Sequence, residues 1–323
     1  MSVYHTPVLL AESISALVTH PDGIYADATF GGGGHTASLL SRLHDGGRVI
    51  AFDRDMEALG NAPDDSRLTL VHNNFRFIEN YAEQLRRSFA DAQDDRKAAQ
   101  DGDRGPAVFD GILADLGVSS HQFDTAERGF SFRYEDAPLD MRMNQEATRT
   151  AAEVVNNCPE AELERILRLY GEVDGARNMA RLITEARSEK ELRTTGDLDR
   201  ALAPMLPRGT EHKVLAKVYQ AFRMEVNQEM RSLEKFLEGA TRSLKDGGRL
   251  VVITYHSLED RMVKNWIRYG NVEGTQQKDL YGRSQAPLEA VNRKPVVPEE
   301  SEIRENTRAR SAKLRIAERR AAL

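Results

Sequence analysis

The residues of this chain that are best suited to chemistry form a glycine-rich turn, followed at a set distance by an acid. Gly31-Gly32-Gly33-Gly34 separates an apolar segment, 23–30, from a helical pattern that begins at His35, and Asp53 ends the next apolar segment twenty residues after Gly33. Such a turn lets backbone N–H groups and a helix N-terminus approach a ligand closely. The acid can accept both ribose hydroxyls of an adenosine. The spacing therefore predicts a site for an adenosine-containing cofactor.

Two cofactors use a turn of this kind, a nicotinamide dinucleotide and S-adenosylmethionine. The dinucleotide fingerprint has a glycine at its sixth position, where this chain, counted from Gly31, has Thr36. His35 is bulky where a pyrophosphate needs close packing, whereas S-adenosylmethionine carries no phosphate. Phe75 follows the third strand-like segment, and we expect its ring to stack on the adenine, with ordinary core packing as the alternative. The turn favours S-adenosylmethionine, and a tight structural turn remains an alternative.

Asp115 ends a fourth strand-like segment, at the point that faces the transferable methyl group in this type of sheet. A cytosine N4 amine is a poor nucleophile because its lone pair is delocalised into the ring. A carboxylate that holds the amine N–H groups would favour a tetrahedral, more nucleophilic nitrogen, and in-line alignment with a methyl sulfonium needs no metal ion. The prolines and aromatic residue that commonly follow this acid in amine methyltransferases are absent, so a cofactor contact or a helix cap remain alternative roles.

Alternating strand-like and helix-like segments must position these residues. Short apolar runs separated by helical stretches predict an α/β fold with a parallel, doubly wound sheet. Helical periodicity dominates after Asp115, and we expect one long helix over 214–237. The strand-like segments are 23–30, 48–53, 67–72, 109–116, 248–255 and 312–316.

The interruption of the α/β pattern by helices predicts two domains. We expect residues 1–120 and 225–323 to form a methyltransferase domain and 121–224 to form an inserted helical domain that recognises the substrate. The segment 86–105 is charged and contains a near-repeat without apolar periodicity. We expect it to be a disordered loop insertion with no part in catalysis.

Composition and charge exclude several classes of protein. The chain has 323 residues, a net charge of −6 and a single cysteine, Cys158, which excludes an intrachain disulfide and a Cys-rich zinc site and fits a reducing cytoplasm. No apolar run approaches the about 20 residues of a membrane-spanning helix, and no signal-peptide pattern opens the chain. The acidic balance opposes binding of nucleic acid by bulk charge. The basic segment 301–323 is expected either to contact phosphates or to form a solvated tail.

Eight motifs occur in an order that closely resembles one known family, the bacterial RsmH or MraW family of 16S rRNA cytosine-N4 methyltransferases. The resemblance covers nearly the whole chain. It implies a Rossmann-like class I methyltransferase fold with an inserted helical domain. It also implies methylation of N4 of cytidine 1402, in the decoding centre of the small ribosomal subunit. The motifs lie at 5–10, 29–35, 53–55, 115–120, 127–132, 138–143, 256–261 and 308–315.

The resemblance also assigns roles to individual residues. It supplies Gln122 as a cofactor contact that the residues alone do not suggest, and the start of the long helix, 213–217, departs from the family pattern, so RNA docking is expected to differ there. A further polar set is expected to grip phosphate or the target base, with mutual pairing as the alternative. The expected cofactor contacts are Gly33, Gly34, His35, Asp53, Phe75, Asp115 and Gln122, and the polar set is Arg142, Arg223, Asn227, His256, Glu259 and Arg261.

Two other classes of function remain as alternatives. One is a nicotinamide-dependent oxidoreductase, which Thr36 in place of a third glycine opposes. The other is a non-catalytic factor that binds RNA or the ribosome and retains a cofactor pocket. The oligomeric state stays open.

Overall fold

The computed structural model describes residues 7–92, 107–277 and 284–321, which fall into two compact units. Unit 1 comprises Met1–Gly117 and Arg231–Leu323, and unit 2 comprises Val118–Met230. Unit 2 thus begins three residues before and ends six residues after the insertion expected at 121–224. Among the described residues, no helix is both long enough and apolar enough to cross a membrane.

Unit 1 contains a seven-stranded sheet with the order β3-β2-β1-β4-β5-β7-β6. The first five strands in the chain run parallel, and β7 pairs antiparallel with both β5 and β6. The direction of winding reverses between β1 and β4, which makes that junction the topological switch point. The strands are β1 (Ile24–Asp27), β2 (Arg48–Asp53), β3 (Leu68–His72), β4 (Phe109–Asp115), β5 (Leu244–Thr254), β6 (Leu288–Ala290) and β7 (Lys313–Arg319).

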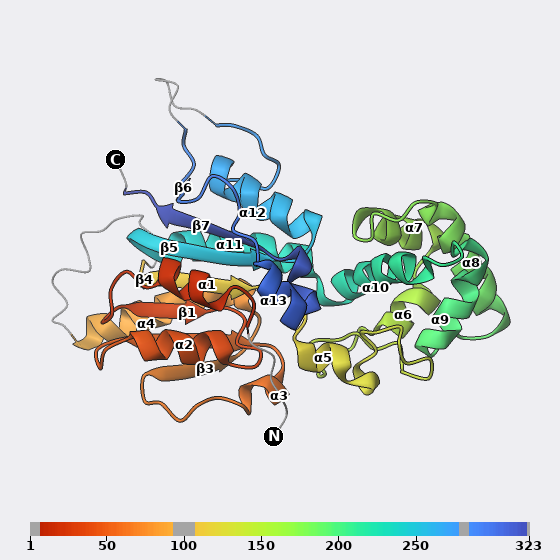
Figure 1. The fold of residues 1–323 in the computed structure, drawn as a ribbon, viewed down its shortest axis with the longest axis horizontal. Helices are drawn as coiled ribbons and strands as arrows, with labels where there is room; N and C mark the ends of the chain where they lie inside the picture. The colour runs from red at the N-terminus through yellow and green to blue at the C-terminus, as the bar shows by residue number, and fades with distance from the viewer. Residues whose placement is uncertain (1–6, 93–106, 278–283, 322–323) are drawn as a thin grey trace. The chain divides into compact units, whose positions relative to one another are not determined.

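Helices cover both faces of this sheet because its strands are apolar on both sides. Successive residues such as Leu250 and Val251 point into different clusters of buried side chains. One cluster joins the sheet to α1 (Leu10–Leu17) and α2 (Gly34–Arg42), and the other joins it to α4, α11 and α12 (Figure 1). The remaining helices of the second face and of the loops are α3 (Met56–Leu59), α4 (Ile78–Ala92), α11 (Glu229–Ser243), α12 (Ser257–Tyr269) and α13 (Glu300–Glu305).

The segment expected to be a loop insertion, 86–105, is helical at its start. Helix α4 continues to Ala92, and Glu83 and Arg87 form an ion pair of 2.7 Å one turn apart on it. Pairs at this spacing support a helix whose outer face has no apolar period. The expectation of a loop was therefore wrong for 86–92, and the rest of the segment lies outside the described residues.

The single long helix expected over 214–237 is two helices, α10 (Glu211–Asn227) and α11. Gln228 separates them with a φ of 49°, in the left-handed region that a non-glycine residue seldom adopts, and its N–H donates to carbonyl groups of the preceding turn. The apolar stripe continues through both helices, so periodicity alone does not reveal the break.

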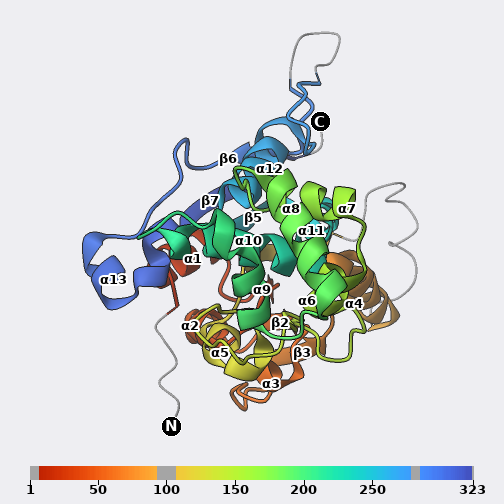
Figure 2. The ribbon, with the colours of Figure 1, turned by 90° about the vertical axis from the view of Figure 1, so that its right-hand side faces the viewer.

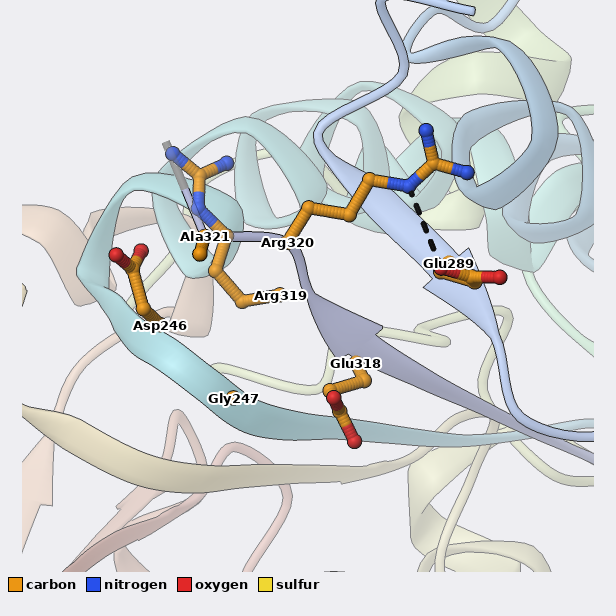
Figure 3. Close-up of a pocket in the computed structure, with 7 residues that line it drawn as sticks. All are labelled: Asp246, Gly247, Glu289, Glu318, Arg319, Arg320 and Ala321. Atoms are coloured by element: carbon orange, nitrogen blue, oxygen red, sulfur yellow. Dashed lines mark ion pairs between the residues drawn. The ribbon is translucent and has the colours of Figure 1, made fainter. Parts of the chain in front are cut away.

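Residues 313–319 of the basic C-terminal segment form β7 of the sheet, so a solvated tail is wrong for them. Arg315 and Lys313 both pair with Asp260 of α12, at 2.7 and 3.4 Å. The pocket in Figure 3 lies where β7 ends and β5 begins, at the edge of the sheet opposite the end of β4, and contains the 3.7 Å pair between Arg320 and Glu289. None of the residues expected at the functional site lines it.

Unit 2 is helical and has a core of its own. Helix α7 packs on α8 and α10, and α9 follows α8 (Figure 2). Tyr219 of α10 anchors α9, because its hydroxyl donates to Asp199 at 3.0 Å and its ring meets Phe132 edge to face. The helices are α5 (Ser120–Asp124), α6 (Ala151–Asn157), α7 (Glu160–Leu169), α8 (Ala176–Glu189), α9 (Thr195–Leu202) and α10.

We expect Asp199→Asn to stabilise the protein at neutral pH. Burial raises the pKa of Asp199 to about 6, and the bond from Tyr219 only partly offsets this. Because the folded state raises this pKa, the carboxyl costs nothing below about pH 4 and destabilises the fold as the pH rises through 6. Allowing for its partial exposure, urea unfolding should show a gain of about 1 kcal/mol at pH 7. No gain should appear at pH 4, and equal stabilities at pH 7 would contradict the assignment.

Candidate functional site

Four polar residues meet at the edge of the sheet where the parallel strands end. Asp27, Asp53 and Asp115 are the last residues of β1, β2 and β4, and Tyr255 directly follows β5. This edge flanks the switch point between β1 and β4, where open α/β sheets bind their ligands. The prediction that Asp53 and Asp115 each end a strand of one sheet is confirmed, and β1 lies between their two strands.

The glycine-rich turn joins β1 to α2, as its position in the sequence predicts. Gly33 caps the helix with a φ of 77°, and a Cβ atom there would lie 2.7 Å from the ring of Phe30. A Cβ atom on Gly34 would collide with the ring of Pro7. Both glycines are therefore needed to pack the turn against its own neighbours. The N–H of Gly33 donates to the carbonyl of Phe30 at 2.8 Å, so the N–H groups that the helix N-terminus offers to a ligand begin at Gly34.

Asp53 holds this turn in place and keeps capacity for a ligand. Its two carboxylate oxygens accept hydrogen bonds from the N–H of Gly31 at 2.8 Å and of Asp55 at 2.9 Å. Burial raises the pKa of Asp53. A carboxylate has about four acceptor positions, so two bonds leave room for ribose hydroxyls. The remaining acceptor positions of Asp53 therefore fit the ribose hydroxyls of an adenosine.

Asp115 lies in a network that links three strands. Its backbone N–H donates to Thr29 at 2.6 Å, its Oδ1 accepts the hydroxyl of Tyr255 at 2.7 Å, and its Oδ2 is 3.8 Å from Nδ1 of His35. Burial raises the pKa of Asp115 to about 6, although His35 and Tyr255 counteract it. The side chain retains 23% of its exposure, so a bound molecule can reach it.

His35 and Phe75 both have protein partners. His35 is buried in the first turn of α2, where Nε2 lies 3.2 Å from the carbonyl of Val8. The ring of Phe75 meets that of Phe236 edge to face at 5.2 Å, and the guanidinium of Arg54 lies 5.7 Å from its centroid. Phe75 therefore packs partly into the core, and stacking on an adenine stays a prediction.

The expected site residues of unit 2 are held by neighbours within that unit. Gln122 completes a capping box with Ser119 at the start of α5. Arg142 binds Asp140 through two nitrogens, at 2.6 and 2.9 Å. These bonds shape a loop and the start of a helix, and both partners, Ser119 and Asp140, lie outside the polar set.

Asn227 and Arg223, at the end of α10, are also engaged. Asn227 accepts the N–H of Met143 at 2.8 Å and donates to the carbonyl of Met141 at 2.7 Å. It thereby fixes Met141, whose φ is 59°. Both guanidinium contacts of Arg223 to Glu229 are 2.9 Å. The binding of substrate by these residues stays a prediction.

His256, Glu259 and Arg261 lie at the start of α12, in unit 1. His256 caps the helix, and its Nε2 is 3.0 Å from Glu259. Glu259 is buried and accepts the N–H of Tyr255 at 3.0 Å, whereas Arg261 is exposed. His256 and Glu259 thus contact each other, and Glu259 also binds the backbone of Tyr255.

Sequence reasoning missed Tyr255 and the pair formed by Thr36 and Asp27. The hydroxyl of Thr36 donates to the buried carboxylate of Asp27 at 2.7 Å and ties the helix to β1. In the sequence, Thr36 indicates only that the third glycine of the dinucleotide fingerprint is absent. The available signal for Tyr255 is its position as the last residue of the strand-like segment 248–255, directly before His256.

A glycine-rich turn after β1, with acids ending β2 and β4 at the switch point, defines a Rossmann-like α/β protein that binds an adenosine-containing cofactor. Comparison with protein families narrows this class. The chain belongs to the MraW methylase family, whose model matches residues 2–320.

Relatives from several bacteria match the whole chain. A protein of Bacteroides thetaiotaomicron named ribosomal RNA small subunit methyltransferase H is 50% identical over 317 residues, covering 98% of each chain. One of Flavobacterium johnsoniae with the same name is 48% identical, again covering 98% of each chain. A solved structure described as a putative rRNA-methylase from Clostridium thermocellum covers 99% of this chain and 100% of its own, at 13% identity with a TM-score of 0.41, and adds nothing to the assignment.

Membership of a methylase family decides between the two cofactors that the turn allowed. The cofactor is S-adenosylmethionine, as predicted, and the nicotinamide-dependent oxidoreductase is no longer a candidate. The predicted α/β fold with a doubly wound, mainly parallel sheet is likewise confirmed, with β7 antiparallel in it.

We expect the affinity for S-adenosylmethionine to fall in mild acid. With a pKa of about 6, Asp115 is ionised at pH 7 and protonated at pH 5, where it loses its capacity as an anionic acceptor. One proton taken up in this range weakens binding about tenfold between pH 7 and pH 5. Calorimetric titrations from pH 5 to 8, on protein shown to be folded throughout, would measure it. An affinity that is constant over this range would contradict the role of Asp115.

Proposed function

We propose that this methylase transfers a methyl group from S-adenosylmethionine to N4 of cytidine 1402 of 16S rRNA, within the small ribosomal subunit and in the cytoplasm. The names of relatives that are about 50% identical over nearly the whole chain support an rRNA substrate. The observation that carries the chemistry is the position of Asp115, at the end of β4 and at the same edge of the sheet as the glycine-rich turn.

The cofactor would be held mainly by unit 1. The backbones of Gly33 and Gly34, at the N-terminus of α2, would lie against the cofactor. Asp53 would accept the ribose hydroxyls, and Phe75 would stack on the adenine. His35 shapes the turn, and Gln122 contributes from unit 2 through the resemblance alone. The bound cofactor supplies an activated methyl group.

Asp115 would act on the acceptor as well as on the cofactor. Its carboxylate accepts N–H groups of the target amine and so favours a more nucleophilic nitrogen. Because N4 is otherwise paired or stacked, the base has to leave its stack to reach this acid. Alignment of the amine with the methyl group supplies much of the rate.

Unit 2 would recognise the RNA around the target. Neighbouring groups of the same unit already bind three of the expected residues, Arg142, Arg223 and Asn227. We therefore propose that these three side chains hold the loops and helix ends that contact the RNA, and do not bind phosphates alone. The exposed Arg261 is better placed for a phosphate, with His256 and Glu259 beside it.

The decisive experiment uses small subunits from a strain that lacks this modification. Incubation with the protein and S-adenosylmethionine labelled in its methyl group should label 16S rRNA, and mass mapping should place the label on N4 of the proposed cytidine. Label on another nucleotide would overturn the choice of site. Absence of label from a protein that binds the cofactor would favour the non-catalytic ribosome-binding factor.

A further inference from the structure

Neither the sequence nor the family resemblance gives a role to Tyr255, which is one of the four polar residues at this edge of the sheet. We propose that Tyr255 is a positioning residue that fixes the Asp115 carboxylate for methyl transfer, and that His256 and Glu259 serve to hold Tyr255. This inference rests on the proposed function of Asp115. His256 and Glu259 thereby gain a task within unit 1 that is separate from the contact with phosphate proposed for Arg261.

The first step is the bond between the two side chains. The Tyr255 hydroxyl donates to Oδ1 of Asp115 at 2.7 Å. Burial and the carboxylates of Asp115 and Glu259 raise the pKa of Tyr255 well above its ordinary value, so the hydroxyl stays protonated and donates throughout the physiological range. The ring packs against the cluster beneath α1 and α2, and its Cδ2 would lie 3.5 Å from a Cβ atom on Gly117. The donor is therefore fixed in direction as well as in charge.

The second step is the support behind Tyr255. Its backbone N–H donates to Oε2 of Glu259 at 3.0 Å, and Oε1 of the same carboxylate lies 3.0 Å from Nε2 of His256. The N–H of Glu259 in turn approaches Nδ1 of His256 at 3.4 Å. Glu259 is only 3% exposed, which leaves little of its carboxylate for an external molecule. These contacts close a ring around the end of β5 and the start of α12.

The two carboxylate oxygens of Asp115 differ in what they can offer to a ligand. Oδ1 is engaged by Tyr255, whereas Oδ2 points toward His35 and is 3.8 Å from its Nδ1, beyond hydrogen-bonding distance. The other charged groups that act on this carboxylate are Asp27 of β1 and Glu259 of α12, and both oppose its ionisation. Tyr255 thus counteracts two acids and orients the remaining oxygen.

The test is the substitution Tyr255→Phe, which removes the hydroxyl and keeps the ring. The affinity for S-adenosylhomocysteine, measured by calorimetry from pH 5 to 8.5, should fall toward low pH as Asp115 takes up a proton; this fall is the acid limb of the profile. In Tyr255→Phe the acid limb should lie about one pH unit higher than in the unaltered protein. At pH 7 the ionised fraction of Asp115 should fall from about nine-tenths to about one half, so methyl transfer should fall at least about twofold, and at pH 8.5 the affinity should approach that of the unaltered protein.

Tyr25→Phe is a matched control in the same unit. The Tyr25 hydroxyl also donates to an acceptor, the carbonyl of His20 at 2.9 Å, but this acceptor belongs to the loop that precedes β1 and not to the acids that end the strands. This variant should leave the pH profile in place even if it lowers the melting temperature. Glu259→Gln, which keeps the hydroxyl and weakens its support, should reduce methyl transfer and leave the ordinary affinity at high pH.

The outcomes separate this inference from the proposed function. An unaltered protein without an acid limb near pH 6 would overturn the role of Asp115, and this inference with it. A limb that is present but does not move in folded Tyr255→Phe would overturn the positioning role alone. If Tyr255→Phe does not fold, unchanged methyl transfer in Glu259→Gln would have the same consequence.

Discussion

Asp115→Asn is expected to slow methyl transfer by about 10²–10³-fold, the loss typical of removing one preorganised polar group from a site of this kind. The amide keeps an oxygen for the Tyr255 hydroxyl, so the network around it should persist. What it loses is the negative charge beside the target amine. Single-turnover methyl transfer on small subunits that lack the modification would measure the change.

The same substitution should not weaken the fold. Since burial raises the pKa of Asp115 to about 6, its ionised form costs the folded state up to about 3 kcal/mol at pH 7, and the neutral amide avoids this cost. Asp110→Asn provides a control on the same strand, because Asp110 pairs with Lys245 at the opposite end of β4. It should leave methyl transfer intact. A folded Asp115→Asn protein with undiminished turnover would contradict the assignment.

Gly33→Ala is expected to abolish measurable cofactor binding, a loss of at least about 100-fold, through two effects that add. A left-handed residue other than glycine costs about 1–2 kcal/mol. The added methyl group would also lie 2.7 Å from the ring of Phe30, which is buried and cannot move without opening the turn. The displaced turn would take its N–H groups away from the cofactor. Calorimetric titration and chemical unfolding would measure both losses.

Gly247→Ala separates these two effects. Gly247 has the same φ of 77° as Gly33, in the same unit, but nothing lies within 4 Å of a Cβ atom there. This variant should lose only about 1–2 kcal/mol of stability and retain its affinity for S-adenosylmethionine. If both variants bind the cofactor normally, the glycine-rich turn has no part in the site.

The strands and the acids that end them are predictable because their signals are local. Runs such as 48–53 are apolar on both faces, and an acid directly after such a run lies at the sheet edge whatever the rest of the chain does. The positions of Asp53 and Asp115 therefore follow from the sequence alone. The antiparallel direction of β7 leaves no comparable signal, because a strand-like segment does not reveal its neighbours.

The partners of polar side chains are not predictable in this way, since they come from distant parts of the chain. Asn227 and Met143 are 84 positions apart, and Tyr255 and Asp115 are 140 apart. From sequence, an Arg or Asn near a presumed cleft is equally suited to RNA and to a neighbouring backbone group. Only the fold shows that Asn227 is buried and bonded to the backbone of Met141, while the side chain of Arg261 is exposed.

The position of β7 has a consequence for how the protein is made. β5, which carries Tyr255 at its end, pairs with β4 on one side and with β7 on the other, and β7 follows every other strand in the chain. During synthesis, β5 therefore keeps an unpaired edge until residues 313–319 have left the ribosome. β5, whose end carries Tyr255, thus gains its second partner only after every other strand of the sheet has left the ribosome.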